Sequence, residues 1–233
     1  ESENGPSVQR FSELAEELGV VVGFGFPEVA EGGKVYNSYA VIDSGGSTYV
    51  YRKTHLHISS SGTRPNEPEY IAPGGYLGLT ETRLGRLGIM ICYDGYFPEV
   101  CRSLVLSGAT VVLWPSRSGG YLAGIGMPLI RACENVVPIV HAEGSQTGGV
   151  VACTAHSLIV CHTGEVLCEF IGVEGVVYAE VDPAAAEKAR RESVDSSALY
   201  RVRRPELYRL GPGIPWGRLM DNVPAVHVNT SGE

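Results

Sequence analysis

The sequence predicts an α/β protein built on mixed β-sheets. Short apolar runs typical of strands alternate with amphipathic helical patterns early in the chain. Other strand-like runs are joined by tight turn signals, at 43–46 and 162–164. Two runs, 87–91 and 110–114, are apolar on both faces, as expected of central strands that are covered on both sides. No repeat or linker divides the 233 residues, so we expect a single domain.

The N-terminal part of the chain predicts one helix and three strands. Residues 7–18 carry apolar side chains at helical spacing, and Gly19 suits the end of a helix. A short apolar strand is expected at 20–26. Residues 36–42 and 48–53 are predicted as the two strands of a hairpin.

A long segment without periodicity, 54–75, follows this hairpin. It contains three prolines and several serines and glycines. Loops of this length inside a compact domain are usually functional or disordered. We therefore look for functional side chains in this segment.

The rest of the chain predicts further strands and helices. Strands are expected at 77–79, 87–91, 110–114, 136–142, 157–161, 166–171 and 176–181. Helices are expected at 98–107, 125–135 and 182–191. Pro98 fits the first turn of its helix and Gly108 fits its end.

Charge and hydropathy limit the functional classes. The formal net charge of −8 and the pI of about 5.3 predict an acidic surface, which repels phosphate backbones. We therefore expect no nucleic-acid partner. No apolar run reaches the roughly 18 residues that a membrane span needs, so we expect no membrane partner.

Cysteine usage bears on the compartment. The six cysteines form no CxxC motif and no tight ligand spacing, and several stand inside apolar runs. They are Cys92, Cys101, Cys133, Cys153, Cys161 and Cys168. This pattern favours reduced, buried thiols in a cytoplasmic protein over a disulfide framework.

One cysteine stands where a nucleophile would be useful. Cys92 follows the apolar run 87–91 and precedes a turn and a helix that begins at Pro98. A nucleophile at the carboxyl end of a buried strand is directed into a cleft, and backbone N–H groups after it can stabilise an oxyanion. From position alone, a buried structural cysteine is the commoner outcome.

Lys53 and Glu67 are the candidate partners of this cysteine. Lys53 ends the strand 48–53, where a fixed positive charge would lower a cysteine pKa from its usual value of about 8.5. Glu67 lies in the long loop, where a carboxylate could keep the lysine charged and oriented. Either residue alone is better explained as an ordinary solvated side chain.

Together these segments resemble the nitrilase superfamily of carbon–nitrogen hydrolases, most of all its simple amidase branch. Residues 51–56 (Tyr-Arg-Lys-Thr-His-Leu) and 91–99 (Ile-Cys-Tyr-Asp-Gly-Tyr-Phe-Pro-Glu) resemble the family's lysine and cysteine signatures. Residues 67–74 resemble its second-glutamate loop. The likeness continues in the family's order at 108–110, 114–115, 131–135, 155–157, 164–167 and 203–208. The ordered set covers nearly the whole chain.

The resemblance implies a four-layer αββα sandwich and a Glu–Lys–Cys site. Cys92 would attack the carbon of a small amide and form a thioester, and water would then release the acid after ammonia has left. Lys53 and the backbone N–H of Tyr93 would stabilise the tetrahedral intermediate, and Glu67 would support the lysine and the substrate. The resemblance implies no cofactor and no metal, and it implies a homo-oligomer.

One part of the family's pattern is not found. The family's general-base glutamate belongs to a strand–helix unit that precedes the first family-like feature of this chain. Glu28 is not that base, because family members carry a separate glutamate at its place. We therefore expect the chain to lack the first βα unit, and to be poorly soluble or inactive as it stands.

Substrate signals are sparse. Gly95 and Tyr96 stand where family members that act on amides with a free carboxylate often carry arginines, which favours a neutral amide over an N-carbamoyl amino acid. Arg117 could still supply a cation for a substrate carboxylate. A surface arginine is an equally good interpretation, and the choice among amide, nitrile and carbamoyl substrates stays open.

Three alternatives stay open beside the amidase. A non-catalytic module of the same fold would act by assembly, and its Cys92 would not be labelled by electrophilic amide analogues. An acyltransferase would pass the thioester to an amine. A metal hydrolase would use His55 and His57, which share one face if they lie on a strand, but the sequence offers no convincing third ligand.

Overall fold

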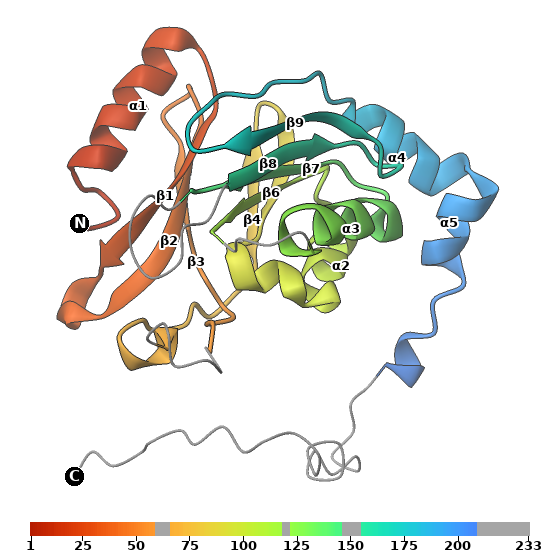
Figure 1. The fold of residues 1–233 in the computed structure, drawn as a ribbon, viewed down its shortest axis with the longest axis horizontal. Helices are drawn as coiled ribbons and strands as arrows, with labels where there is room; N and C mark the ends of the chain where they lie inside the picture. Colours follow the sequence, from red (N-terminus) through yellow and green to blue (C-terminus); the bar gives the residue numbers. More distant parts are fainter. Residues whose placement is uncertain (59–65, 118–121, 146–154, 209–233) are drawn as a thin grey trace.

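The computed structural model describes residues 1–58, 66–117, 122–145 and 155–208, which form two packed β-sheets flanked by helices (Figure 1). The first sheet is antiparallel and has the strand order β1-β2-β3. Its strands are β1 (Val22–Val29), β2 (Val35–Ile42) and β3 (Thr48–Arg52). The second sheet has the order β4-β5-β6-β7-β8-β9. Its strands are β4 (Gly78–Thr82), β5 (Gly85–Ile89), β6 (Val111–Ser116), β7 (Ile139–Glu143), β8 (Ala155–Val160) and β9 (Val166–Gly172).

The second sheet is mixed. Strands β5, β6 and β7 are parallel, and β4, β8 and β9 add to them in antiparallel fashion. The carboxyl ends of the three parallel strands meet at one edge of the sheet. Side chains that follow these ends are therefore brought together.

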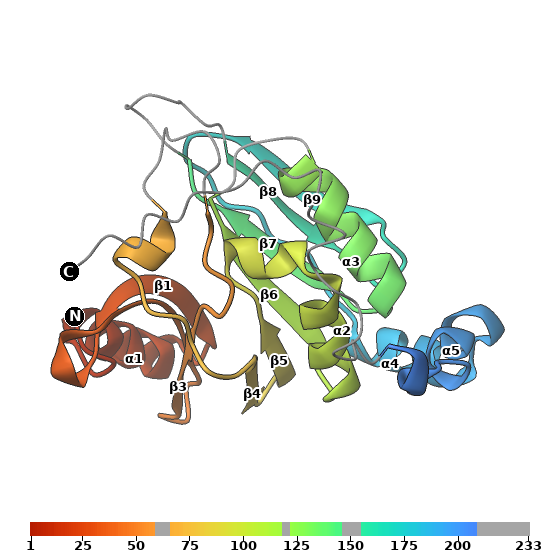
Figure 2. The same cartoon turned by 90° about the horizontal axis from the view of Figure 1, so that it is seen from below.

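Helices cover the outer face of each sheet. Figure 2 shows α1 (Pro6–Leu18) outside the first sheet, and α2 (Pro98–Leu106) with α3 (Met127–Asn135) outside the second. Helices α4 (Pro183–Glu192) and α5 (Val194–Arg201) lie beyond the end of α3. Short helical turns lie at Glu31–Gly33, Glu67–Glu69, Cys92–Tyr96, Leu122–Gly126 and Pro205–Leu207.

Three apolar clusters hold these four layers together. Side chains of both sheets meet in one cluster, which contains Tyr39, Val41, Tyr51, Leu87, Ile89, Ile91 and Val111. A second joins α1 to the first sheet through Val8, Ala15, Phe26, Ala40 and Ile42. The third joins the second sheet to α2 and α3, and Met90, Leu104 and Trp114 are among its buried members. The layer order is αββα, as the resemblance implied.

The helix ends follow local chemistry. Gly19 ends α1 in the left-handed conformation (φ 63°), which a residue without Cβ adopts at little cost. Pro6, Pro98 and Pro183 each stand in the first turn of a helix, where a missing N–H has no consequence. The helix predicted at 7–18 is confirmed, with its start at Pro6 and its end at Leu18.

Several boundaries differ from the predictions. The strand expected at 136–142 begins at Ile139, because Val136 has a left-handed backbone (φ 49°) that caps α3. The helix expected at 125–135 begins at Met127, after the helical turn Leu122–Gly126. Helix α5 was not predicted.

The strand predicted at 176–181 is wrong. This segment does not form a strand, and its backbone does not pair with any strand in the described part of the chain. Val176 and Tyr178 are 86% and 87% exposed, although Val181 packs against the cluster between the sheets. A mostly apolar run forms a strand only where a neighbouring strand supplies hydrogen bonds.

The cysteine prediction holds in part. The five cysteines within the described residues are free thiols, and Cys101 is buried. Cys133 is exposed, however, and Cys92, Cys161 and Cys168 are partly exposed. Among the described residues, no helix is long and apolar enough to cross a membrane.

Candidate active site

Cys92 stands on a tight turn directly beyond β5. It begins the helical turn Cys92–Tyr96, and its backbone has a φ of 48°. A residue other than glycine is uncommon in this left-handed region, and such conformations cost on the order of 1–3 kcal/mol. The surrounding structure must hold this turn in place, and three sets of contacts do so.

The first contact set belongs to Asp94, whose side chain is fully buried. Its carboxylate accepts a hydrogen bond from the backbone N–H of Ile91 at 2.9 Å and from the hydroxyl of Tyr51 at 2.8 Å. It also accepts from the backbone N–H of His55 at 2.8 Å and from the hydroxyl of Thr54 at 3.1 Å. One carboxylate thus joins the turn that begins at Cys92 to the segment that follows Lys53. Burial and the nearby Asp94 charge raise the pKa of Tyr51, so its hydroxyl stays a donor.

The second contact set comes from Trp114 on β6. Its Nε1–H donates to the backbone oxygen of Cys92 at 2.9 Å. The indole ring lies so close to Gly95 that a Cβ at that position would overlap it. Only glycine therefore fits at position 95 of the turn that begins at Cys92.

The third contact set comes from α3. Arg131 donates from Nε to the carbonyl of Gly95 at 3.0 Å and from a terminal nitrogen to the carbonyl of Tyr96 at 3.2 Å. Its other terminal nitrogen pairs with Glu134 at 2.7 Å. A buried guanidinium thus satisfies two carbonyls of the turn that would otherwise lack partners.

Lys53 and Glu67 form an ion pair at the base of the pocket. Lys53 Nζ lies 2.5 Å from Glu67 Oε2, and the lysine side chain is only 1% exposed. The same Glu67 oxygen accepts the backbone N–H of His57 at 2.6 Å. The backbone of Lys53 is fixed by hydrogen bonds to Asn37 and Gly74. The glutamate therefore neutralises the buried ammonium and fixes its direction.

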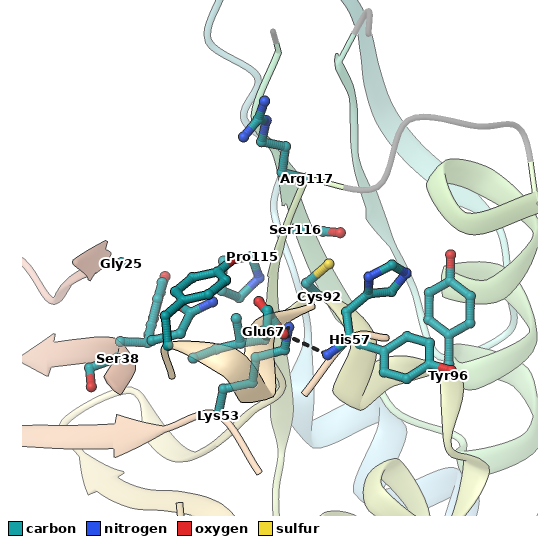
Figure 3. Close-up of a pocket in the computed structure, with 15 residues that line it drawn as sticks. Gly25, Ser38, Lys53, His57, Glu67, Cys92, Tyr96, Pro115, Ser116 and Arg117 are labelled. Carbon is teal, nitrogen blue, oxygen red and sulfur yellow. Dashed lines mark hydrogen bonds and ion pairs between the residues drawn. The ribbon is translucent and has the colours of Figure 1, made fainter. Parts of the chain in front are cut away.

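A pocket of about 570 Å³ brings these groups together (Figure 3). Its described lining comprises Gly25, Asn37, Ser38, Tyr39, Lys53, His57, Glu67, Tyr70, Ile91, Cys92, Tyr93, Tyr96, Pro115, Ser116 and Arg117. All five residues predicted from the sequence, Lys53, Glu67, Cys92, Tyr93 and Arg117, line this one cavity. Figure 3 places Arg117 at the end of the pocket away from Lys53. Arg117 itself is exposed.

Aromatic side chains form one wall of the pocket. His57 meets Tyr93 edge-to-face at 5.1 Å, and Tyr93 lies 5.0 Å from Tyr96, measured between ring centroids. Burial and the charges of Cys92, Tyr93 and Glu143 raise the pKa of Tyr96. Tyr96 thus keeps its proton and can donate a hydrogen bond in the cavity. Only its closeness to Cys92 in the sequence hinted at such a position.

Glu28 does not line the pocket. It is buried and accepts hydrogen bonds from Ser38 at 2.6 Å and from Arg52 at 2.5 and 2.9 Å. Burial pushes the pKa of Glu28 upward, but the bonds from Arg52 and Ser38 outweigh it and leave the pKa below its ordinary value. Its carboxylate anchors Arg52, the residue before Lys53.

The two histidines considered as metal ligands lie in different surroundings. His55 contacts Asp94 through Nδ1 at 3.0 Å and stacks on Phe97. His57 lines the pocket beside Tyr93. Within the described ranges, no three His, Cys, Asp or Glu side chains are grouped as a metal site would need.

Sequence comparison gives a family and several curated relatives. A sequence model described as Carbon-nitrogen hydrolase matches residues 1–191. The N-carbamoylputrescine amidase of Arabidopsis thaliana is 31% identical over 229 residues, which cover 89% of this chain and 73% of that protein. The citrullinase of Francisella tularensis subsp. tularensis is 31% identical over 219 residues, which cover 87% of this chain and 74% of that protein.

Solved structures share the fold. A carbon-nitrogen hydrolase from Helicobacter pylori G27 superposes with a TM-score of 0.77 at 27% identity and covers 87% of this chain and 74% of that chain. Saccharomyces cerevisiae Nit3, described as a member of branch 10 of the nitrilase superfamily, gives a TM-score of 0.70 at 27% identity. That match covers 81% of this chain and 69% of Nit3.

Proposed function

The chain belongs to the carbon–nitrogen hydrolase family of amidase-type enzymes, and we propose that it hydrolyses a small amide to an acid and ammonia through a thioester on Cys92. One observation carries this proposal. The thiol of Cys92 shares a pocket with the buried Lys53–Glu67 ion pair, whose atoms lie 2.5 Å apart. A thiol nucleophile beside a fixed cation suits acyl transfer.

In the first step the sulfur of Cys92, as thiolate, attacks the amide carbon. The carbonyl oxygen becomes an oxyanion, which needs donors already in place. Lys53 supplies an ammonium that Glu67 holds in position, and the backbone N–H of Tyr93 is the second proposed donor. The C–N bond then breaks, ammonia leaves with an added proton, and an acyl-thioester remains.

In the second step water attacks the thioester carbon, and the C–S bond breaks to release the acid. Both steps need a general base. Glu67 is poorly suited, because its Oε2 already accepts from Lys53 and from the N–H of His57. Of the described residues that line the pocket, Glu67 is the only carboxylate. We therefore assign the base to a carboxylate outside this lining, as the family resemblance implies.

The substrate is proposed to be a small compound that carries an uncharged amide or carbamoyl group. The names of the relatives, N-carbamoylputrescine amidase, citrullinase and deaminated glutathione amidase, support this class. Arg117 is proposed to bind a carboxylate where the substrate has one, because it is the exposed cation of the described lining. The resemblance further supports a homo-oligomer, and the cysteine pattern supports a cytoplasmic location.

Ammonia release from small amides, a nitrile and a carbamoyl amino acid tests the proposal. In a protein that includes the family's base-bearing strand–helix unit, we expect release by the wild type and a loss of at least ~10³-fold in Cys92→Ala. Cys168→Ala, a partly exposed cysteine on β9, is the matched control and should retain activity. Release that survives in Cys92→Ala would exclude the thiol mechanism. If no variant releases ammonia and an electrophilic amide analogue does not label Cys92, the results would favour a non-catalytic module.

A further inference from the structure

Away from the pocket, two thiols lie against the same turn residue. Cys133, near the end of α3, donates its S–H to the backbone oxygen of Thr163 at 3.0 Å. Cys161, directly after β8, has its Sγ 2.8 Å from the hydroxyl oxygen of Thr163. Cys133 is exposed and Cys161 is partly exposed, so small solutes can reach this pair.

The turn that joins β8 to β9 is shaped to receive the helix thiol. Gly164 has a φ of 89°, and its N–H donates to the carbonyl of Cys161 at 3.0 Å. A Cβ on Gly164 would overlap Cys133 Sγ. The absent side chain is therefore what allows the sulfur of α3 to rest on the backbone of the turn.

We propose that Cys133 and Cys161 form an oxidisable dithiol site, which closes to an intrachain disulfide on reaction with hydrogen peroxide. The Cys161 thiolate attacks one peroxide oxygen, the O–O bond breaks, and the departing hydroxide takes up a proton as water. The resulting sulfenic acid is attacked by the sulfur of Cys133, which loses its proton. The S–O bond breaks, the S–S bond forms, and a second water leaves. The two sulfurs are oxidised and the peroxide is reduced.

The surroundings of the two thiols indicate which one reacts first with peroxide. The partial loss of water around its sulfur, which rests against the β8–β9 turn, and next to it the neighbouring Cys161 thiol raise the pKa of Cys133. Cys133 is accordingly the protonated partner, as its hydrogen bond to the Thr163 carbonyl requires. The attack on peroxide therefore falls to Cys161 and the closing step to Cys133.

The disulfide would tie α3 to the β8–β9 turn. Two residues before Cys133, Arg131 holds the carbonyls of Gly95 and Tyr96 in the nucleophile turn. Oxidation would therefore restrict the movement of α3, the helix whose Arg131 is hydrogen-bonded to the turn at the active site. We expect the melting temperature of the oxidised protein to rise by roughly 3–8 °C, because the cross-link restricts the unfolded chain.

Peptide mapping of the whole chain tests the site. The protein is treated with hydrogen peroxide, its remaining thiols are alkylated, and it is digested without reductant for mass spectrometry. We expect one linked peptide pair that contains Cys133 and Cys161, lighter by two hydrogen atoms and released by dithiothreitol. Full alkylation of both cysteines after peroxide, or links from them only to other cysteines, would overturn the proposal.

Variants test the assigned order. Cys133→Ser should leave Cys161 as a sulfenic acid that dimedone traps, and it should lose the rise in melting temperature. Cys161→Ser should leave Cys133 unoxidised under the same conditions. Cys168→Ser is the matched control and should form the linked pair as the wild type does. Mapping of the wild type needs no variant to fold, so the proposal stays testable if a serine variant does not.

Discussion

The buried carboxylate of Asp94 accepts the backbone N–H of His55 at 2.8 Å, and this bond connects the two halves of the active site. Asp94 belongs to the turn that begins at Cys92, and His55 stands two residues after Lys53 in the segment that follows β3 of the first sheet. The strained turn at Cys92 and the buried ammonium of Lys53 are therefore positioned by one side chain. The separation of nucleophile and cation depends on a residue that touches neither the thiol nor the ammonium.

Asp94→Asn should therefore impair catalysis and stability together. The amide NH₂ would face some of the donors that now point at a carboxylate. Each donor pair left unsatisfied should lower the free energy of unfolding by roughly 1–3 kcal/mol. We expect kcat to fall about 10–100-fold with a smaller change in KM, since a misplaced nucleophile affects chemistry more than binding. Steady-state kinetics and urea denaturation measure both effects. Asp195→Asn, in an exposed first turn of α5, is the control, and wild-type kinetics for Asp94→Asn would refute this role.

The Lys53–Glu67 pair makes a double-mutant cycle informative. Glu67→Gln leaves a buried ammonium without its counter-charge and should cost roughly 3 kcal/mol in the free energy of unfolding. Adding Lys53→Met removes that ammonium, so the double variant should regain most of the stability but none of the activity. Denaturant unfolding and ammonia release measure the two quantities. Glu69→Gln, exposed two residues further on, is the matched control, and additive losses would contradict the predicted coupling.

Gly95→Ala tests the packing beneath the nucleophile turn. The added Cβ would overlap the ring of Trp114, whose Nε1–H holds the carbonyl of Cys92. We expect a loss of about 1–3 kcal/mol in stability and a clear fall in kcat, because the turn must shift away from the indole. Thermal unfolding and kinetics measure these losses. Gly45→Ala, which meets nothing within 4 Å, should match the wild type, and equal behaviour of the two variants would disprove the steric argument.

The sequence was sufficient to predict which candidate residues share the pocket, because each of them stands in a short segment. Lys53, Glu67 and Cys92 each stand in a recognisable stretch, and the structure brings them into one pocket. The supporting residues were missed because their roles depend on packing across layers. Nothing local to Trp114 indicates that it binds the carbonyl of Cys92. Likewise, nothing local to Asp94 indicates that it binds the backbone of His55, which follows the last strand of the first sheet.

The same distinction explains the errors in the fold. Helix α1 and the hairpin of β2 and β3 are fixed by periodicity and by turn residues close in sequence. The segment 176–181 has an equally good strand pattern, yet a strand also needs a neighbour, and the described chain supplies none there. Helix α5 has a weak apolar stripe, and Ser193 begins it by accepting the N–H of Ser196. Local patterns cannot report whether a partner is present.

Stability should depend on pH through His141, a buried residue of β7. Its ring meets Trp114 edge-to-face, and both ring nitrogens are buried without a well-formed hydrogen bond to a described residue. Burial lowers the pKa of His141 from 6.5 to about 4, with the nearby Glu143 charge acting in the opposite direction. The unfolded chain therefore binds a proton near pH 6.5 that the folded chain resists until about pH 4. This contribution to stability is complete above pH 6.5 and is lost as the pH falls toward 4, by roughly 3 kcal/mol in total.

Urea denaturation between pH 7.5 and 4.5 measures this loss, and His141→Phe should flatten it while keeping the aromatic contact with Trp114. His162→Gln, in the β8–β9 turn, removes a histidine that is not buried and should leave the slope unchanged. Carboxylates with lowered pKa values, such as Glu28, lose their contribution to folding stability only below their ordinary pKa of 4.5. They therefore do not account for a loss of stability between pH 7.5 and 4.5. A slope that persists in His141→Phe would place the proton uptake on another group. A slope lost in both variants would mean that histidine number, and not the burial of His141, sets the pH dependence.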